Sequence, residues 1–381
     1  MLILIGIPDF DYGNEQSAVR SFLLTVGNAF TENGAEVDYA GDMTPKPYQP
    51  AGSLKGGAVQ KVKSILKKWP WLYQSLVLRS YFKRQHLLVE SLKKKGPYDL
   101  VVEFHTVGST VGKQLAAYWN AEFSVIFDSP VDEQFYEMHQ TKTLFWGQIK
   151  NTERQTMEAA QKIMAYSPTC KKHIESNYDI TAKVAVLPCV IHKSAAENLA
   201  DQKTFNIVFI GSFLSWHKVD QLVEAFAIFQ QDNPHSKLQL IGHGVEWERI
   251  KNLVKAKGLE EKVEMPGFVD EVTLLDYKQK ANVAVMPGSN WYGSPLKLFE
   301  YAFSEIPFIA PATPTVSSIF KDKEHCLFVN EKEEVVSLVK ALNFYNENAD
   351  KGKEMAQQAR EFISENFGVE AYAAKLVKAL S

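Results

Sequence analysis

The sequence is short of cysteine, of long apolar runs and of net charge, and each shortage excludes a class of protein. Only three of its 381 residues are cysteines. Cys170, Cys189 and Cys326 are spaced too irregularly for a disulfide framework or a metal site. We therefore expect them to be small buried hydrophobic residues in a reducing compartment. The formal net charge is −3, so the overall charge gives no indication of a nucleic-acid partner.

No apolar run approaches the roughly 18 residues that a membrane span needs. The first residues, MLILIGIP, form too short an apolar run for a secretory signal, and Asp9 and Asp11 follow them. We therefore expect a cytoplasmic protein, and these observations leave peripheral attachment to the inner face of a membrane open.

Positive charge is concentrated in one stretch, from Lys55 to Lys95. It holds eleven Lys or Arg and a single acid, Glu90, although the whole chain has 42 bases and 45 acids. One interpretation is that helices here cover a sheet and that their lysines are solvated. The other is a basic helix with Trp69 and Trp71 at its end, which is typical of interfacial membrane binders. This second interpretation predicts docking on an anionic leaflet that carries a lipid-linked acceptor, chiefly through Lys61, Lys63, Lys67 and Lys68.

Short apolar segments alternate with amphipathic segments along the whole chain. In the first half, YDLVVEFH and FSVIFDSP are expected strands, and a long helical region is expected from Glu133 to Ala165. Such alternation predicts an α/β protein with parallel sheets and crossover helices, in two doubly wound domains. The predicted organisation is an N-terminal domain at 1–190 with a basic helical insert at about 55–95, a linker at 191–205, a C-terminal domain at 206–365, and a helix at 366–381 that packs back on the N-terminal domain.

The segment YGSPLKLFEYAF predicts a helix with Ser294 as its N-cap and Pro295 in its first turn. Lys297 then lies where the backbone already presents positive charge and where acids are favoured. Either this lysine is simply solvated, or an anion rests on the helix N-terminus beside it. Glu300 shares the same helix face. The two side chains either pair with each other or hold a diphosphate and a vicinal diol, both of which a nucleotide offers.

The segment FIGSFLSWHK predicts a strand, a glycine turn at Gly211 and a following helix. His217 and Lys218 are expected near the N-terminus of that helix, where two cations suit an anion, unless they are ordinary loop residues. In LIGHGVEWERI, Trp247 occupies the third place of a dinucleotide fingerprint, which argues against NAD. The DFD segment, Asp9 to Asp11, offers an alternative metal–diphosphate site, but we expect no metal.

Three segments in succession carry a family resemblance: FIGSFLSWHKVDQLVEAF, LIGHGVEWERIKNLVKAKGLEEKVEMPGFV and SPLKLFEYAFSEIPFIAP. Their order and spacing resemble the retaining glycosyltransferases of family 4, most closely from Asn206 to about Ala312. The resemblance implies the GT-B fold, in which two Rossmann-like domains face each other across a cleft.

The resemblance also implies roles for individual residues. Glu300 matches the second Glu of the family's Glu-x7-Glu motif, which holds the ribose hydroxyls, whereas the first Glu, which contacts the sugar, falls on Tyr292. The family's Arg in the glycine turn falls on Ser212, and its phosphate-binding Lys falls on His217. The implied donor-binding set is Gly211, Ser212, His217, Lys218, Gly267, Val269, Ser294, Pro295, Leu296 and Glu300. The implied catalytic set is His105, Asp128, Glu133 and Lys297, with Asp128 as a helix cap left open.

The function that the resemblance implies is transfer of a sugar, with retention, from a nucleoside diphosphate sugar to a glycan or lipid-linked acceptor. A UDP-sugar is expected before a GDP-sugar, and the setting is surface polysaccharide or glycoconjugate biosynthesis. No cofactor is expected, because the donor is a substrate. A GT-B epimerase or phosphorylase and a catalytically inactive nucleotide-sugar-binding subunit are the alternatives.

Overall fold

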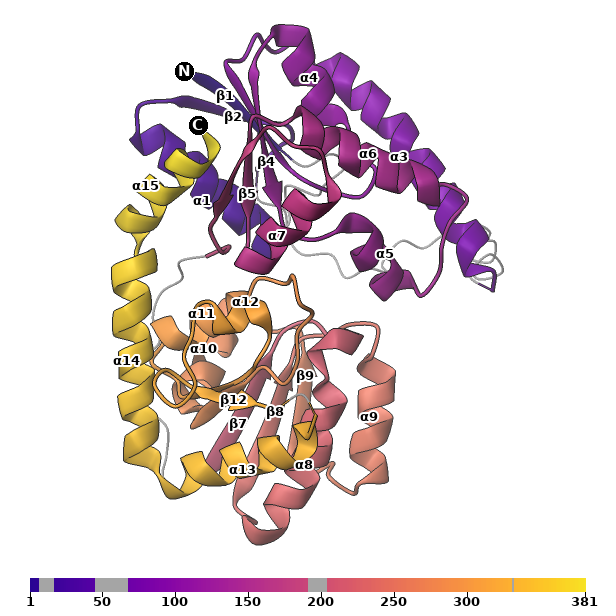
Figure 1. Cartoon of the computed structure of the whole chain (residues 1–381). Coiled ribbons are helices and arrows are strands. Elements are labelled where there is room, and N and C mark those ends of the chain that lie inside the picture. The colour runs from indigo at the N-terminus through magenta and orange to yellow at the C-terminus, as the bar shows by residue number, and fades with distance from the viewer. Residues whose placement is uncertain (7–16, 45–67, 191–203, 331) are drawn as a thin grey trace. The chain divides into compact units, whose positions relative to one another are not determined.

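The computed structural model describes residues 1–6, 17–44, 68–190, 204–330 and 332–381. These form two compact units (Figure 1). Unit 1 comprises Met1–Pro188 with Tyr372–Ser381, and unit 2 comprises Cys189–Ala371.

Unit 1 is built on a parallel sheet of six strands with the order β2-β1-β3-β4-β5-β6. Its strands are β1 (Leu2–Gly6), β2 (Glu36–Tyr39), β3 (Leu100–Phe104), β4 (Glu122–Phe127), β5 (Lys162–Ala165) and β6 (Lys183–Val186). Its helices are α1 (Ala18–Glu32), α3 (Pro70–Leu92), α4 (Val111–Trp119), α5 (Val131–His139), α6 (Trp146–Ala159), α7 (Pro168–Asn177) and α15 (Val369–Leu380).

Unit 2 repeats this architecture with the strand order β12-β11-β10-β7-β8-β9, again with parallel pairs. Its strands are β7 (Phe205–Ile210), β8 (Ser236–Ile241), β9 (Val263–Gly267), β10 (Val283–Val285), β11 (Phe308–Pro311) and β12 (Leu327–Val329). Its helices are the 3₁₀ turn η1 (Ser215–His217), α8 (Val219–Asp232), α9 (Trp247–Ala256), α10 (Glu271–Lys280), α11 (Leu296–Phe303), α12 (Pro314–Ser317), α13 (Glu334–Glu347) and α14 (Ala349–Phe367).

The predicted fold class is confirmed, because each unit is a doubly wound parallel sheet flanked by helices, as in GT-B proteins. That the units face each other across a cleft stays a prediction. Strands such as β3 and β7 are almost continuously apolar because helices cover both faces of such sheets. All three cysteines are buried, as expected, and none of them forms a disulfide.

One detail of the prediction needs correction, whereas the packing of the C-terminal helix on the N-terminal unit agrees with it. The region from Glu133 to Ala165 is not one helix, because α5 ends at His139, Gln140 adopts a left-handed conformation as its C-cap, and α6 begins only at Trp146. The region then closes with β5. The C-terminal residues lie in unit 1, where the Ser124 hydroxyl donates a hydrogen bond of 2.6 Å to the carbonyl of Leu380.

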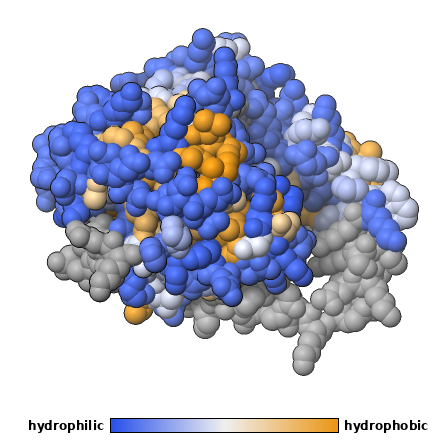
Figure 2. All heavy atoms as spheres, turned by 90° about the horizontal axis from the view of Figure 1, so that it is seen from below, coloured by the Kyte–Doolittle hydropathy of each residue, from blue (hydrophilic) through white to orange (hydrophobic). Residues whose placement is uncertain are grey.

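The surface shown in Figure 2 is largely hydrophilic, with apolar residues exposed at several places and most of them near the centre of the view. Among the helices that the structure describes, none combines the length and the apolarity required to cross a bilayer.

Candidate functional site

The strand order of unit 2 reverses between β7 and β10, and ligands of doubly wound sheets bind at the carboxyl ends of the strands beside such a reversal. Gly211 follows β7 at this point with φ of 153°. A Cβ atom on Gly211 would lie 2.1 Å from Cε of Lys297, and one on Gly242 would lie 2.1 Å from the carbonyl oxygen of Gly211. The two glycines therefore let the backbone and Lys297 approach closely, as the sequence predicts for Gly211.

Lys297 lies in the first turn of α11, as predicted, and its ammonium group contacts His217. The Lys297 Nζ atom is 3.0 Å from Nε2 of His217, and Nδ1 of His217 is 2.6 Å from the carbonyl oxygen of Ser212. Because an ammonium group only donates, Nε2 must accept, and Nδ1 must carry the hydrogen that Ser212 receives. The glycine turn thus orients a neutral imidazole, and the imidazole positions the lysine. The ring of Phe209 lies beneath, 5.9 Å from Nζ.

The protonation states follow from this arrangement. Burial, together with the Lys297 charge, lowers the pKa of His217 to about 3. Burial lowers the pKa of Lys297 to about 8, although the nearby Glu300 carboxylate opposes this shift. At neutral pH Lys297 is therefore a poorly solvated cation, which favours an anionic ligand.

The expectation of two cations at His217 and Lys218 is wrong. His217 is uncharged, and Lys218 is paired with Glu334 of α13. Lys218 instead adopts φ of 50° and connects η1 to α8. The cation that the structure places at the glycine turn is Lys297, which comes from a different part of the sequence.

Glu300 lies one turn deeper in α11 and forms an ion pair with Lys278 of α10. The side chains are 17% and 6% exposed, so water screens the pair little. Sequence reasoning missed Lys278, because a lysine in the last turn of a helix is ordinary and 22 residues separate the partners. Tyr301, beside Glu300, accepts a hydrogen bond of 3.2 Å from the backbone N–H of Ile210 and so joins α11 to β7.

The predicted start of this helix is wrong in one respect. The helix begins at Leu296, Pro295 is its cap residue, and no side chain caps it. The Ser294 hydroxyl instead lies 3.2 Å from both the N–H and the carbonyl of Cys189. Ser294 therefore fixes the segment before α11 to the beginning of unit 2. Tyr292, at the family's sugar-contacting position, is buried against Trp291.

The predicted base-reading loop, Gly267 to Val269, follows β9. Gly267 has φ of 79°, and its carbonyl accepts a 2.9 Å hydrogen bond from Gly242 N–H. Phe268 is exposed and stacks on His243 with ring centroids 6.1 Å apart, and the centroids of His243 and Trp247 are 4.6 Å apart. This loop therefore presents an aromatic edge beside the glycine turns. Its predicted role stays a prediction.

In unit 1, His105 follows β3 and lies between two carboxylates. Its Nδ1 is 3.8 Å from Oε1 of Glu103, and its Nε2 is 3.8 Å from Oε2 of Glu153. All three residues are buried, and His105 is only 1% exposed. Burial alone would lower the pKa of His105, but the two carboxylates raise it to about 9, so the imidazole is a cation at neutral pH.

Each of these carboxylates also caps a helix. Glu103 Oε2 accepts a 2.6 Å hydrogen bond from Gly112 N–H in the first turn of α4, and Glu153 Oε2 accepts a 2.8 Å bond from Val131 N–H at the start of α5. Neither helix has a local side-chain N-cap. Buried carboxylates at helix N-termini are favourable. Glu103, His105 and Glu153, here called the buried triad, therefore connect β3, α4, α5 and α6.

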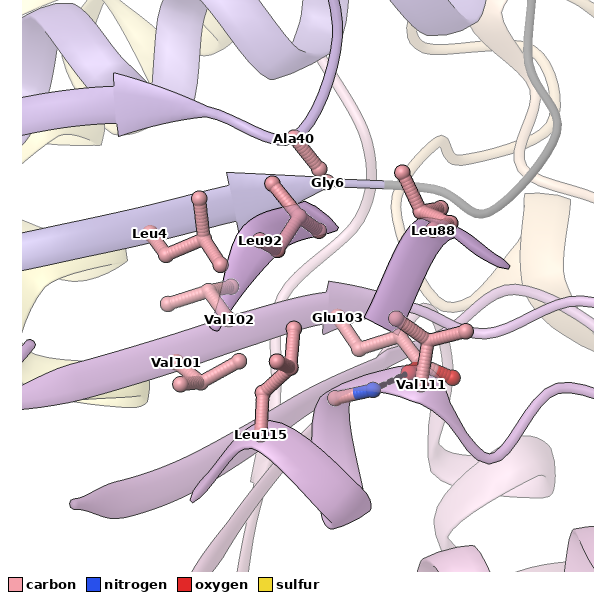
Figure 3. Close-up of a pocket in the computed structure, with 11 residues that line it drawn as sticks. Leu4, Gly6, Ala40, Leu88, Leu92, Val101, Val102, Glu103, Val111 and Leu115 are labelled. Atoms are coloured by element: carbon pink, nitrogen blue, oxygen red, sulfur yellow. Dashed lines mark hydrogen bonds between the residues drawn. The ribbon is translucent and has the colours of Figure 1, made fainter. Parts of the chain in front are cut away.

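Figure 3 shows the Glu103 carboxylate, with its hydrogen bond drawn as a dashed line beside Val111. Apolar side chains, among them Leu88 and Leu92 of α3, surround a cavity of about 20 Å³ next to it. A cavity of this size holds about one water molecule. It is a packing gap beneath α3 and not a ligand pocket.

Of the other predicted residues of unit 1, Asp128 lies close to the buried triad. Asp128 follows β4, and burial raises its pKa to about 6. It does not cap α5, whose cap residue is Pro130; it accepts a 3.1 Å hydrogen bond from the Ser129 hydroxyl. Glu133 is exposed in the first turn of α5. The structure thus brings His105 and Asp128 together, but it surrounds His105 with protein groups, which favours a positioning role.

Asp9, Asp11, Lys61, Lys63 and Lys67 lie outside the described residues. Within the part of the chain that the structure describes, no three His, Cys, Asp or Glu side chains are grouped so that they could hold a metal ion.

Residues 190–362 match the family model for glycosyl transferases group 1. An uncharacterized glycosyltransferase of Haemophilus influenzae is 27% identical over 173 residues, which are 45% of this chain and 48% of that protein. The chain therefore spans about half the length of this curated relative. Both matches are likenesses over part of the chain, and the residues that match the family model lie within unit 2.

Solved structures resemble the whole chain. Anabaena HepE in complex with UDP and glucose has a TM-score of 0.71 at 14% identity, covering 100% of this chain and 99% of that one. A sucrose-phosphate synthase from Thermosynechococcus elongatus has a TM-score of 0.67 at 18% identity, covering 99% and 98%. At such identities the likeness shows the fold alone.

Proposed function

We propose that this protein is a retaining glycosyltransferase that takes a sugar from a UDP-sugar and transfers it to a glycan or lipid-linked acceptor. The observation that carries the proposal is Lys297, a buried cation held by neutral His217 over Gly211 at the reversal point of the sheet. The group 1 match covers this site, and HepE of the same fold was solved with UDP and glucose.

The residues of unit 2 suit the departure of a nucleoside diphosphate. Lys297 and the N-terminus of α11 present positive charge to the diphosphate, whose negative charge increases as the bond to the sugar breaks. The low solvation of Lys297 strengthens this interaction. Glu300, held by Lys278, is placed one turn away to accept hydrogen bonds from ribose hydroxyls. No metal is required in this account, because Lys297 and the helix neutralise the diphosphate.

In unit 1, Asp128 and Glu133 are the candidates for orienting hydroxyl groups of the reacting sugars, and the buried triad positions the helix that carries Glu133. In the proposed reaction, which would serve surface polysaccharide or glycoconjugate biosynthesis, unit 2 binds the donor and unit 1 binds the acceptor. An inactive donor-binding subunit is the second candidate, because Tyr292 is buried where the family has a sugar-contacting Glu.

A thermal-shift comparison of UDP, GDP and their sugars, followed by an assay of UDP release, tests the donor. A ligand that binds only the folded state raises the midpoint by mass action. We expect UDP and UDP-sugars to stabilise the protein and UDP to be released with a suitable acceptor. Binding without release under any acceptor would favour the inactive subunit, and stabilisation by GDP alone would overturn the choice of base.

The described part of the basic stretch supports reversible attachment to an anionic membrane. Helix α3 and its N-cap residue, Trp69, expose large apolar side chains, those of Trp69, Trp71, Leu76 and Leu87 among them. Leu76 and Leu87 lie three helical turns apart on one face, with Arg79, Lys83 and Arg84 beside them. Each basic side chain near such a surface contributes about 1 kcal/mol, and tryptophan favours the interface.

Sedimentation with liposomes tests this attachment. Binding should require anionic lipid, weaken with salt, and fall when Lys83 and Arg84 become serine. The matched control replaces Lys251 and Lys255, two exposed lysines of α9, which removes the same charge elsewhere. If both double variants lose liposome binding equally, or if binding does not depend on lipid charge, a water-soluble acceptor is the better proposal.

A further inference from the structure

A cavity of about 460 Å³ opens on unit 1 at α5 and the segment that leads into α6. Its lining is Asp132, Glu133, Tyr136, Glu137, Lys142 and Trp146. The volume falls within the range of about 300–1,000 Å³ that small-molecule sites occupy. All of the lining belongs to unit 1, to α5, the segment after it and the first residue of α6.

Two aromatic rings form a corner in this cavity. The centroids of Tyr136 and Trp146 are 6.5 Å apart, and the ring planes meet at 77°. Trp146 is fixed from behind by Phe135, which belongs to a buried cluster with Leu78 and Ile149. Tyr136 is 45% exposed, so part of its ring is available to a ligand. Aromatic faces present a partial negative charge, which suits the C–H groups of an apolar ligand face.

Most of the charged side chains around these two rings are carboxylates. Asp132 and Glu133 precede Tyr136 by about one turn of α5 and so lie on its side of the helix, and Glu137, one turn after Glu133, also lines the cavity. Asp132 is held in place by the Glu133 N–H at 3.0 Å and by Lys150 at 3.8 Å. Ionised carboxylates only accept hydrogen bonds, and Lys142, 5.5 Å from the Trp146 ring centroid, is the one ammonium group of the lining.

This combination selects a class of ligand. Three carboxylates against one ammonium repel an anion. The described residues include no grouping that could hold a metal ion, so a cation bound by these three acids is not supported. A ligand with several hydroxyl donors and an apolar C–H face satisfies both the acids and the rings, and a pyranose ring has this chemistry.

We propose that this cavity binds a neutral sugar residue of the acceptor, with its C–H face against Tyr136 and Trp146 and its hydroxyls donating to the α5 carboxylates. Lys142 donates to a ring or hydroxyl oxygen of the same sugar. That this sugar belongs to the acceptor rests on the proposed function, whereas the binding of a sugar by the cavity does not depend on it. The proposal excludes uronic acids and sulfated sugars from this position.

Saturation-transfer NMR on the full chain tests the inference. The probes are the methyl glycosides of glucose, galactose and N-acetylglucosamine, and of glucuronic acid as the anionic probe, with UDP present at saturation to occupy the donor site. At least one neutral glycoside should receive saturation through its ring C–H protons, several-fold more than the glucuronide. Tyr136→Ala and Glu137→Gln should each lower this signal several-fold.

Matched controls separate this effect from general destabilisation. Tyr118→Ala removes another exposed tyrosine, on α4, and Glu158→Gln neutralises an exposed acid on α6 outside the cavity. Both should leave the signal unchanged. The inference is overturned if no neutral glycoside gives a Tyr136-dependent signal, if the glucuronide binds equally well, or if the controls act like the cavity variants. If the protein binds a neutral glycoside but does not bind UDP, the proposed donor is wrong and the proposed sugar site in this cavity is not affected.

Discussion

Replacing His105 with glutamine should destabilise unit 1 and remove a step from its pH dependence. The pKa of His105 rises from 6.5 to about 9 in the folded protein, between the Glu103 and Glu153 carboxylates. Because the folded state holds the proton more tightly, this stabilisation is fully present below pH 6.5 and is lost as the pH rises through about 9. A pKa shift of this size corresponds to about 3 kcal/mol. Removing the cation also leaves two buried carboxylates without their counter-charge, which typically costs about 3–5 kcal/mol.

The other titrating groups around the imidazole act outside this window. The pKa of Asp128 is raised from 3.8 to about 6, so it reduces stability as the pH rises between these values. The pKa of Glu153 is lowered, so its contribution is lost on the acid side, and the raised pKa of Tyr178 affects stability only above about pH 10. The pKa of Cys170 is raised from 9.0 to about 11, so its contribution is lost only above about pH 9. Between pH 7 and 8.5 the loss should therefore come from His105 and amount to about 2 kcal/mol.

The buried cysteines offer an assay that separates the two units. Cys170 lies in α7 of unit 1, and Cys326 lies in unit 2. Pulsed thiol labelling across a urea gradient, read by mass spectrometry, gives the free energy of unfolding around each cysteine. The wild-type value at Cys170 should fall by about 2 kcal/mol from pH 7 to 8.5, and that of His105→Gln should start lower and stay nearly flat. Cys326 is the internal control, because its free energy of unfolding should be the same in the two proteins at each pH. Parallel pH profiles for the two proteins at Cys170 would refute the charged triad.

Three further results are expected. In a calorimetric titration, the affinity of the wild type for UDP should fall about tenfold as the pH rises from 8 to 10, because Lys297, with a pKa of about 8, loses its charge. Lys297→Ala should bind UDP weakly at both pH values. Lys278→Met should cost about 3–5 kcal/mol in urea unfolding read at Cys326, because it removes the buried counter-charge of the Glu300 carboxylate, whereas Lys280→Met on the exposed side of α10 should cost little; equal costs would argue against a buried pair. UDP release should survive EDTA, and a rate that collapses and returns with Mg²⁺ would revive the Asp9 and Asp11 metal site.

The parts of the site that the sequence predicts are those encoded within a few residues. The neighbouring residues are enough to predict that Gly211 forms the turn between a strand and a helix and that Lys297 lies in the first turn of a helix. The sheet topology then brings the two together at the predicted strand end. The orientation of His217 cannot be read in this way. Its position suggests a cation, but burial against Lys297 makes it neutral, and burial depends on how β7 and α11 pack.

The carboxylate partners are beyond sequence reasoning for a related reason. Glu103 interrupts an apolar strand, which is a signal that such a residue has a buried partner, although it does not name the partner. Glu153 and Lys278 lie in ordinary amphipathic helices, and nothing local distinguishes them from solvated charges. Their roles arise from contacts with residues 48 and 22 positions away, His105 and Glu300.

Calorimetric titration of UDP into the wild type and into Glu300→Gln tests the central claim, a nucleotide-diphosphate site built by α11 and the Gly211 turn, most directly. The substitution keeps the shape of the side chain and removes one charged acceptor, which is worth about 1.5–3 kcal/mol. Thiol labelling at Cys326 confirms that the variant is folded under the conditions of the titration. The account predicts that the wild type binds UDP and that Glu300→Gln binds it at least about tenfold more weakly. A wild type that does not bind UDP, or a folded variant with an unchanged Kd, would contradict it.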